Sequence, residues 1–186
     1  ADVKSIKSKY GTFIKEVVKV DTSKMTKLSD VAEDAIISSG EYSISTAEEL
    51  VKLSKMPNNS QIKGGRFVLA NDIDMSAYST GEGFEPIAKY GGFKGMVNGN
   101  GYVIRNLYIN RPNEANVALI GGAHVEVRNL GLENVDITGG SGVTGGIVGQ
   151  GQMNGLTNCY VNGGSIKTAT KYIHAQIGGI AGGLQY

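Results

Sequence analysis

The sequence predicts a mainly β protein that folds as a short β-solenoid, and two repeated motifs carry this prediction. An asparagine-containing apolar motif occurs at residues 103–107, 126–130 and 155–159. A glycine-rich motif occurs at residues 118–122, 146–150 and 179–183. The central asparagines are 23 and then 29 residues apart, and the matching glycines are 28 and then 33 apart. A period of this length, rich in Gly, Asn and β-branched residues, is typical of stacked coils.

The composition changes near Gly64, which divides the chain into two parts. Residues 1–63 contain two of the 28 glycines, whereas ten of the fourteen lysines precede Gly64. Glycine suits the tight corners of a solenoid, where side chains of stacked coils would collide. We therefore expect a small α/β leader before the solenoid. Its apolar and polar residues predict a strand over 11–20 and a short helix over 29–37.

A second helix is predicted over residues 46–55. Thr46 or Ser45 is suited to the N-cap, and Ser45 and Glu48 have the spacing of a capping box. Leucines recur on one face of this segment. A helix this short needs an apolar surface to pack on. We expect it to cap the N-terminal end of the solenoid, because end coils need covering.

The repeated residues have expected structural roles. Coils stack at the spacing of strands in a sheet, about 4.8 Å, so equivalent side chains can bond from coil to coil. This predicts a structural ladder formed by Asn106, Asn129 and Asn158. It also predicts corner glycines, one in each coil, at Gly121, Gly149 and Gly182.

An ordered series of motifs resembles bacterial surface domains that carry the GLUG motif. The matching segments are YSISTAEEL at 42–50, FVLANDIDM at 67–75, FEPI at 84–87, FKGMVNGNG at 93–101, IRNL at 104–107, GGIVG at 145–149 and TNCY at 157–160. The resemblance implies a right-handed β-helix domain over 42–186, preceded by a leader over 1–41. It also implies an extracellular location on a bacterial cell surface, in a haemagglutinin-like adhesin or a similar large protein. It implies no catalytic residues.

Asp72 and Asp74 form the one sequence pattern that suggests a metal ion. Side chains two residues apart on a strand face the same way, so the two carboxylates could share a Ca²⁺ with backbone oxygens. The alternative is structural: Asp72 caps a turn and Asp74 bonds to backbone donors at the next corner. The second interpretation is favoured, because the segment belongs to the family's structural signature.

Composition argues against several other classes of protein. The formal net charge is only +1, and the basic residues are scattered along the chain, so no nucleic-acid partner is expected. No apolar run reaches the roughly 18 residues of a membrane span, and no signal peptide is visible. His124 and His174 do not form a zinc-peptidase motif, and no serine-hydrolase motif occurs. Cys159 is expected to be a small buried hydrophobic residue, since it occupies the position that Leu107 and Leu130 have in the other two copies of the motif.

Two functional uses of the fold remain open. A carbohydrate-active β-helix needs paired carboxylates on adjacent coils. The solenoid half has eight acidic residues: Asp72, Asp74, Glu82, Glu85, Glu114, Glu126, Glu133 and Asp136. In a regular strand Glu133 and Asp136 point to opposite faces. Glycan recognition could instead use exposed tyrosines as stacking platforms. The candidates are Tyr78, Tyr90, Tyr102, Tyr108, Tyr160 and Tyr172.

We therefore expect a non-enzymatic extracellular module without a cofactor, which acts as a structural or display stalk and as an adhesion domain. Binding of a glycan or protein ligand is expected at the loops 110–116 and 139–142, where the repeats differ in length. Further coils or domains of a larger parent protein are also expected as neighbours. Two alternatives remain: a fragment of a polysaccharide lyase or glycosidase, and a structural subunit of a surface filament.

Overall fold

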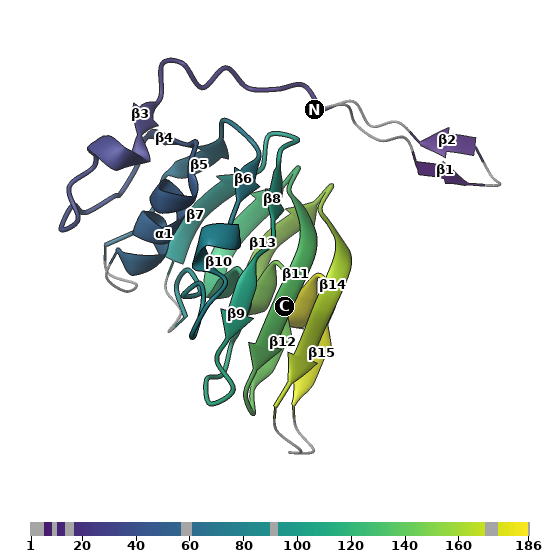
Figure 1. Ribbon diagram of the computed structural model, residues 1–186. Helices are drawn as coiled ribbons and strands as arrows, with labels where there is room; N and C mark the ends of the chain where they lie inside the picture. The colour runs from purple at the N-terminus through teal and green to yellow at the C-terminus, as the bar shows by residue number, and fades with distance from the viewer. Residues whose placement is uncertain are drawn as a thin grey trace.

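The protein is a mainly β fold, a β-solenoid of about four turns with one helix. Figure 1 shows the stacked strands and an α-helix at one end of the stack. The structure, a computed structural model, describes residues 6–8, 11–13, 17–56, 61–89, 93–169 and 175–185. The predicted fold class, a mainly β protein built around a short β-helix, is confirmed.

Three parallel sheets run along the solenoid. The first sheet has the order β16 (Ala181–Gln185), β13 (Val148–Thr157), β10 (Ile120–Arg128), β7 (Phe93–Asn98), β5 (Arg66–Leu69), β4 (Glu41–Ile44) and β3 (Thr26–Lys27). The second has the order β14 (Tyr160–Thr168), β11 (Gly131–Gly139), β8 (Val103–Arg105) and β6 (Ile73–Asp74), with β9 (Tyr108–Asn110) also paired to β11. The third consists of β12 (Val143–Gly145) and β15 (Gln176–Gly178).

The core lies inside the coils and is filled mainly by aliphatic side chains. On β11, for example, Leu132, Val135 and Ile137 point inward and are fully buried. An aromatic stack crosses the first coils, where Phe67 lies between Tyr42 and Phe93. Burial of these apolar side chains is the main favourable contribution to the stability of the stack.

The helix predicted over 46–55 is confirmed as α1 (Ala47–Lys55). The Thr46 hydroxyl accepts a hydrogen bond from the Glu49 amide at 3.2 Å. The buried Glu49 carboxylate accepts the Ser45 amide at 2.6 Å and the Ser29 amide at 3.1 Å. Glu49 therefore closes the N-terminus of α1 and also binds the leader to it.

The leader differs from its predicted structure. Only η1 (Leu28–Asp30) is helical within the segment expected to form a helix over 29–37, so that prediction is wrong. The neighbouring β3 pairs with β4 instead, so the first sheet extends to the N-terminal side of residue 42. Of the strand expected over 11–20, β2 (Gly11–Phe13) is formed and pairs with β1 (Ile6–Ser8) in a separate hairpin (Figure 1).

Residues 17–20 are not part of a strand, and the backbone of Val20 bonds to an asparagine side chain of the solenoid. The buried Asn100 accepts the Val20 amide at 2.7 Å and donates to the Val20 carbonyl at 3.1 Å. The ammonium group of Lys19 lies 3.6 Å from the centroid of the Tyr102 ring. A turn of the solenoid thus anchors the leader.

We expect Asn100→Ala to lower the free energy of unfolding by about 1–3 kcal/mol, because the partly buried backbone groups of Val20 and the buried carbonyl of Leu69 lose their partner. The substitution is also expected to speed amide hydrogen exchange at Val20. The control is Asn113→Ala, which changes an exposed asparagine. Equal exchange at Val20 in the wild type and in Asn100→Ala would contradict this account of the leader.

Candidate functional site

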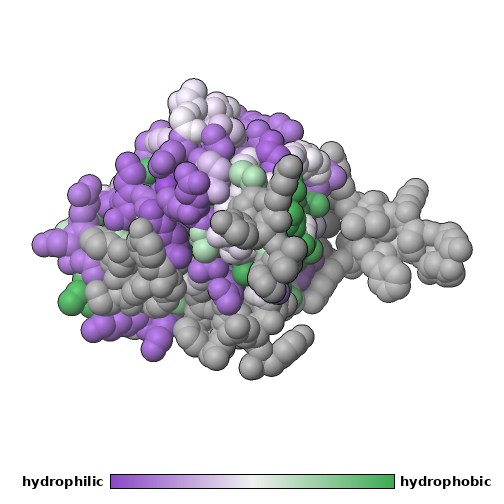
Figure 2. All heavy atoms as spheres, turned by 90° about the horizontal axis from the view of Figure 1, so that it is seen from below, coloured by the Kyte–Doolittle hydropathy of each residue, from purple (hydrophilic) through white to green (hydrophobic). Residues whose placement is uncertain are grey.

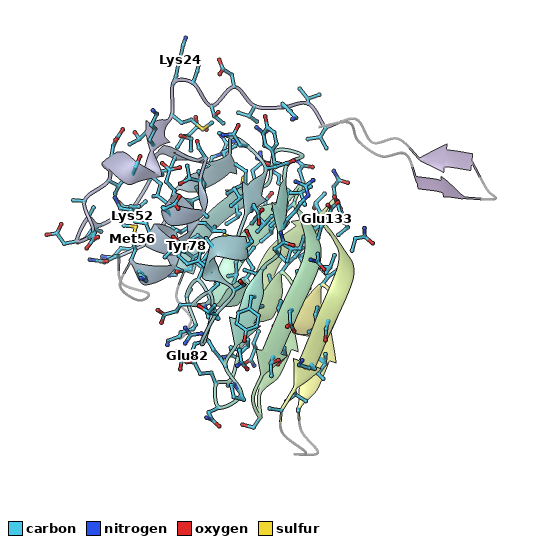
Figure 3. All side chains as sticks on the ribbon, viewed as in Figure 1. Lys24, Lys52, Met56, Tyr78, Glu82 and Glu133 are labelled. Atoms are coloured by element: carbon cyan, nitrogen blue, oxygen red, sulfur yellow. The ribbon has the colours of Figure 1, made fainter. Side chains whose placement is uncertain are left out.

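The most elaborate polar arrangement lies on the outer face of the second sheet. Arg105 on β8 donates from Nη1 to Asp72 Oδ2 at 2.9 Å and from Nε to Glu133 Oε2 at 3.0 Å. The Tyr160 hydroxyl on β14 donates to Glu133 Oε1 at 3.1 Å. Four side chains from successive coils therefore form one continuous row; Figure 3 labels Glu133 within it.

Within this row, the contact between Asp72 and Arg105 favours the charged forms of both groups. Burial alone would raise the pKa of Asp72, but hydrogen bonds from Arg105 and the Val103 amide outweigh it, so the pKa is lowered. The hydrogen bond to Asp72 raises the pKa of Arg105. These groups therefore act as a fixed ion-pair network across the coils, because neither member changes charge near neutral pH.

Tyr160 has a perturbed pKa. Burial and the hydrogen bond to the Glu133 carboxylate raise the pKa of Tyr160 from 10 to about 12. The pKa of Tyr160 is therefore higher in the folded protein than in the unfolded chain. The stability that this difference contributes is fully present below pH 10, and it is lost as pH rises from about 10 to about 12.

Tyrosine ionisation can be followed by absorbance as pH rises, and subtracting the curve of Tyr160→Phe from that of the wild type isolates Tyr160. We expect this difference curve to have its midpoint near pH 12. In a Glu133→Gln background this midpoint should fall toward 10, because the carboxylate that opposes ionisation is gone. A midpoint near 10 in the wild-type background would contradict the Tyr160–Glu133 contact.

Asp72 and Asp74 are used in contacts between coils. Asp72 accepts the Val103 amide at 2.9 Å in addition to Arg105. Asp74 accepts the Ser76 amide and the Asn106 side-chain amide, each at 2.9 Å, and the Asn106 contact is the main cause of its lowered pKa. Within the described part of the chain, no group of three or more His, Cys, Asp or Glu side chains could hold a metal. The structural interpretation of the pair therefore fits these contacts.

An asparagine ladder connects three coils near the turns that join the first and second sheets. The Asn158 amide donates to Asn129 Oδ1 at 2.9 Å, and the Asn129 amide donates to Asn98 Oδ1 at 3.3 Å. Both Asn129 and Asn158 have φ of 53°, in the left-handed region that asparagine tolerates. Two of the three predicted ladder residues are therefore in one ladder.

Asn106 belongs to a second ladder, so its predicted grouping with Asn129 and Asn158 is wrong. It accepts a hydrogen bond from Asn134 at 2.7 Å and donates to Asp74. The cause is a difference in register. Val103 pairs with Gly131, so the two sequence copies of the motif occupy different corners of the solenoid.

An open depression of about 520 Å³ lies along the second ladder. It is lined by polar side chains and one tyrosine: Ser79, Asn106, Tyr108, Asn134, Asp136, Ser165 and Lys167, with Leu107, Val135 and Gly164. The exposed Asp136 and Lys167 face each other at 3.7 Å. The depression thus offers hydrogen-bond donors, acceptors and one aromatic ring to solvent.

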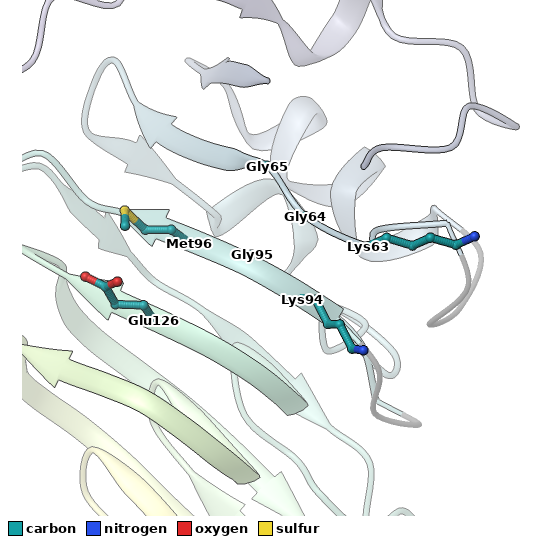
Figure 4. Close-up of a pocket in the computed structure, with 7 residues that line it drawn as sticks. All are labelled: Lys63, Gly64, Gly65, Lys94, Gly95, Met96 and Glu126. Carbon is teal, nitrogen blue, oxygen red and sulfur yellow. The ribbon is translucent and has the colours of Figure 1, made fainter. Parts of the chain in front are cut away.

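A second open depression, also of about 520 Å³, lies on the outer face of the first sheet (Figure 4). Its floor is the backbone of Gly64, Gly65 and Gly95. Lys63 and Lys94 point outward at one end, and Met96 and Glu126 lie at the other (Figure 4). A Cβ added to Gly95 would lie 2.9 Å from the Gly65 carbonyl oxygen, so the two coils are closely stacked at this point.

The glycine-rich motifs align in space as they do in sequence. Ile120 pairs with Val148 and Val148 with Ala181, which places Gly121, Gly149 and Gly182 at one stacked position. A Cβ on Gly149 would lie 2.5 Å from the Gly121 carbonyl oxygen. A side chain at this position would therefore prevent the coils from stacking.

The two carboxylates on β11 do not point to opposite faces as expected. Asn134 has φ of 53° and lies between them, and this extra residue shifts the alternation of side chains. Glu133 and Asp136 both lie on the outer face, while Leu132 and Val135 point inward. The strand is irregular at this point, and the prediction assumed a regular one.

Each acidic residue of the solenoid half has a polar partner. The contacts are Asp72 and Glu133 with Arg105, Asp74 with Asn106, Glu82 and Glu114 with Arg111, Glu85 with Lys89, Glu126 with Arg128, and Asp136 with Lys167. Sequence reasoning missed the pairs that join coils, such as Arg105 with Asp72 and Glu133, because these partners are 33 and 28 residues apart in the sequence. A general acid of a glycosidase needs a raised pKa, whereas the pKa values of Asp72 and Asp74 are lowered.

The predicted tyrosine platforms occupy different environments. Tyr78 and Tyr102 pack against the core, and Tyr108 lines the depression on the second sheet. Tyr90, Tyr172 and His174 lie outside the described residues, as does the side chain of His124. Cys159 is partly buried against the core, and burial raises the pKa of its thiol. It stacks beneath the fully buried Leu130, in agreement with the expected hydrophobic role.

The two loops expected to bind ligands are packed on each other. The Gly140 amide donates to the Glu114 carbonyl at 2.9 Å, and the Arg111 amide donates to the Thr138 carbonyl at 2.9 Å. Pro112, Asn113 and Ser141 remain exposed on the resulting ridge. The buried Arg111 guanidinium contacts Glu114 at 2.8 Å and Glu82 at 3.1 Å, which fixes the shape of the ridge.

These contacts define a stacked β-solenoid whose outer polar side chains bond largely to neighbouring coils. No helix in the described part of the chain combines the length and the apolar character that a membrane crossing requires. No protein-family model matches the chain.

Two curated relatives and one solved structure are similar to this chain. Halomucin of Haloquadratum walsbyi is 36% identical over 142 residues, which cover 73% of this chain and 2% of halomucin. A protein of Evansella cellulosilytica, provisionally named a Gly-rich membrane protein, is 34% identical over 131 residues, which cover 63% of this chain and 15% of that protein. The chain therefore spans only a small part of the length of either relative.

The solved structure supports the fold. It is a Bacteroides ovatus protein provisionally named an immunoglobulin A1 protease, and it matches with a TM-score of 0.51 at 18% identity. The match covers 78% of this chain and 53% of that chain. At this identity the likeness concerns the fold alone.

Proposed function

We propose that the chain is a non-enzymatic structural and display module of an extracellular cell-surface protein. The observation that carries this proposal is the use of outer polar side chains in contacts between coils. Arg105 binds carboxylates on both neighbouring coils, and Asn129 bonds in both directions along its ladder. Such side chains hold a stack together and are poorly placed to hold a substrate.

The comparisons add support for a surface location. One relative is named halomucin and another is provisionally named a membrane protein. In both, the matched region is a small part of a much longer chain. The resemblance to GLUG-motif surface domains supports the same proposal. A short rigid solenoid within a long surface protein is suited to spacing and presenting the domains on either side of it.

Adhesion is the second part of the proposal, and the depression on the second sheet is its proposed site. A hydroxyl-rich saccharide matches the charged pair Asp136 and Lys167 and the ring of Tyr108, which line the depression beside the coil-to-coil bonds of Asn106 and Asn134. Asp136 and Lys167 are more than half exposed, and their long 3.7 Å contact leaves both able to bind a ligand.

The test is a binding screen of the purified chain against immobilised glycans and extracellular matrix proteins. We expect binding to a saccharide that Asp136→Asn and Lys167→Ala each weaken by roughly tenfold, equivalent to about 1.4 kcal/mol. The matched control is Lys24→Ala, which removes an exposed lysine of the leader. Absence of binding across the panel, or binding that all three variants retain, would remove adhesion at this depression from the proposal.

A further inference from the structure

The turn between β7 and β8 contains two consecutive Asn-Gly pairs, at residues 98–99 and 100–101. Asparagine followed by glycine is prone to deamidation, because the glycine nitrogen has no bulky neighbour and can reach the carbonyl carbon of the asparagine side chain. In a folded protein the reaction is slow wherever hydrogen bonds and packing hold these two groups. The contacts of the two pairs therefore indicate which of them can react.

The pair at residues 98–99 is held between coils. Asn98 Oδ1 accepts the Asn100 backbone amide at 2.9 Å and the Asn129 side-chain amide at 3.3 Å. The Gly99 amide donates to the Arg128 carbonyl at 2.8 Å, and a Cβ on Gly99 would collide with the Asn129 carbonyl oxygen. The Gly99 nitrogen is thus freed only when the coils separate, so the stack protects Asn98.

The pair at residues 100–101 is covered by the leader. Asn100 is 2% exposed, and two of the three hydrogen bonds of its side-chain amide join it to Val20, at 2.7 and 3.1 Å. The third is to the Leu69 carbonyl at 3.3 Å. The nearest atoms to a Cβ built on Gly101 belong to the Val17 side chain, at 3.3 Å. Residues 17–20 therefore close this pair off from water.

The leader is held on this turn by few contacts. Residues 17–20 lie outside any strand, and Val18 is 87% exposed. The ammonium group of the exposed Lys19 lies 3.6 Å from the centroid of the Tyr102 ring. The leader crosses the upper turns of the stack (Figure 1), and the view from below shows mainly hydrophilic residues on the opposite side (Figure 2). A segment that buries so little apolar surface opens locally at a low free energy.

We propose that Asn100 is a site of deamidation, which reacts when the leader lifts and then keeps the leader from docking again. In the lifted state, a hydrogen bond of 3.0 Å to the Asn129 carbonyl still holds the Gly101 amide. When this bond opens, water or hydroxide takes the amide proton, and the nitrogen attacks Cγ of Asn100. The bond from Cγ to Nδ2 breaks, and ammonia leaves with a proton from water, which gives a cyclic succinimide. Water then opens the ring to aspartate or isoaspartate, so the net change consumes one water molecule and releases one ammonia.

The product cannot replace Asn100 in its contacts with the leader. Asn100 Nδ2 donates to the carbonyls of Val20 and Leu69, whereas a carboxylate would turn a charged oxygen toward both, at an almost fully buried position. The remaining bond from the Val20 amide offsets this loss only in part. Isoaspartate also lengthens the backbone of a tight turn in which Asn100 and Gly101 have φ of 55° and 76°. The reaction is therefore a one-way release of the leader, and it is independent of the proposed display and adhesion roles.

A time course of the folded chain at mildly alkaline pH tests the site, with each sample digested by trypsin and sequenced by mass spectrometry. The peptide of residues 95–105 contains both asparagines, and its fragments show which side chain has lost its amide nitrogen. We expect Asn100 to react and Asn98 to stay intact, whereas both react in the chain unfolded by denaturant. Val20→Pro lacks the amide that Asn100 Oδ1 accepts, so it is expected to speed the reaction at Asn100 by roughly fivefold. The matched control, Val18→Ala, changes an exposed side chain of the same segment and is expected to react like the wild type.

A second measurement tests the release of the leader. Asn100→Asp, which makes the product directly, is expected to speed amide hydrogen exchange at Val20, whereas Asn113→Asp, at an exposed position, is not. Circular dichroism confirms that the solenoid of each variant is folded. Equal reaction at Asn98 and Asn100 in the folded chain overturns the proposal, as does an equal rate at Asn100 in the wild type and in Val20→Pro. Wild-type exchange at Val20 in Asn100→Asp overturns it too, because the leader would then stay docked on the product.

Discussion

Replacing Phe67 with alanine is expected to lower the free energy of unfolding by about 3–5 kcal/mol. The Phe67 side chain is fully buried, and its ring is 5.4 Å from the Tyr42 ring and 5.5 Å from the Phe93 ring. Alanine would leave a cavity between three coils and would remove both aromatic contacts. Chemical denaturation followed by far-UV circular dichroism measures the change.

The control for Phe67→Ala is Val18→Ala, which truncates a leader side chain that is 87% exposed. We expect this control to change the free energy of unfolding by less than about 0.5 kcal/mol. A loss of less than about 1 kcal/mol in Phe67→Ala would contradict an aromatic stack that joins the first coils.

Gly149→Ala is the second substitution with a large expected effect, a loss of about 2–3 kcal/mol in the free energy of unfolding. The new methyl group would lie 2.5 Å from the Gly121 carbonyl oxygen and 2.9 Å from the Asn116 carbonyl carbon. Both contacts are with backbone atoms of the preceding coil, which can move only if the stack opens. Thermal or chemical unfolding measures the loss.

Gly179→Ala is the matched control, because Gly179 belongs to the glycine-rich motif of the last coil and an added Cβ there would meet no atom within 4 Å. We expect a change of less than about 0.5 kcal/mol for this variant. If Gly149→Ala and Gly179→Ala lowered the free energy of unfolding equally, the close contact between coils at Gly149 would not be the cause of the loss.

Sequence reasoning found the fold because its strongest signal, the glycine-rich motif, follows a physical requirement. Gly121, Gly149 and Gly182 align in sequence and also in space, since any side chain at that position would separate the coils. The helix α1 was also predictable from the sequence. Its N-terminal signals are local, so Thr46 and the first-turn glutamates suffice to define it.

The asparagine motif misled the prediction because similar residues are required at more than one corner. Asn106 and Asn129 both adopt left-handed backbone conformations at turns, and both are followed by leucine. Their positions in the coil depend on the lengths of turns between strands, which a motif does not contain. In the leader, the backbone of Val20 bonds to the side chain of Asn100, 80 residues away in the sequence, and a contact between such distant residues leaves no local sequence signal.

The candidate site could be predicted only in part. The acidic residues were all visible in the sequence, but their partners were not. Arg105 contacts Asp72 and Glu133, which are 33 and 28 residues away. These separations equal about one coil, so the ion pairs follow from the register of the stack.

The central claim is that the outer carboxylates stabilise the stack and take no part in turnover. It is tested most directly by incubating the purified chain with a panel of acidic and neutral polysaccharides and measuring new reducing ends and unsaturated products. We expect no product above the protein-free control, and no difference between the wild type and Glu133→Gln. Product formed by the wild type and abolished in Glu133→Gln would contradict the account and would identify a carbohydrate-active enzyme.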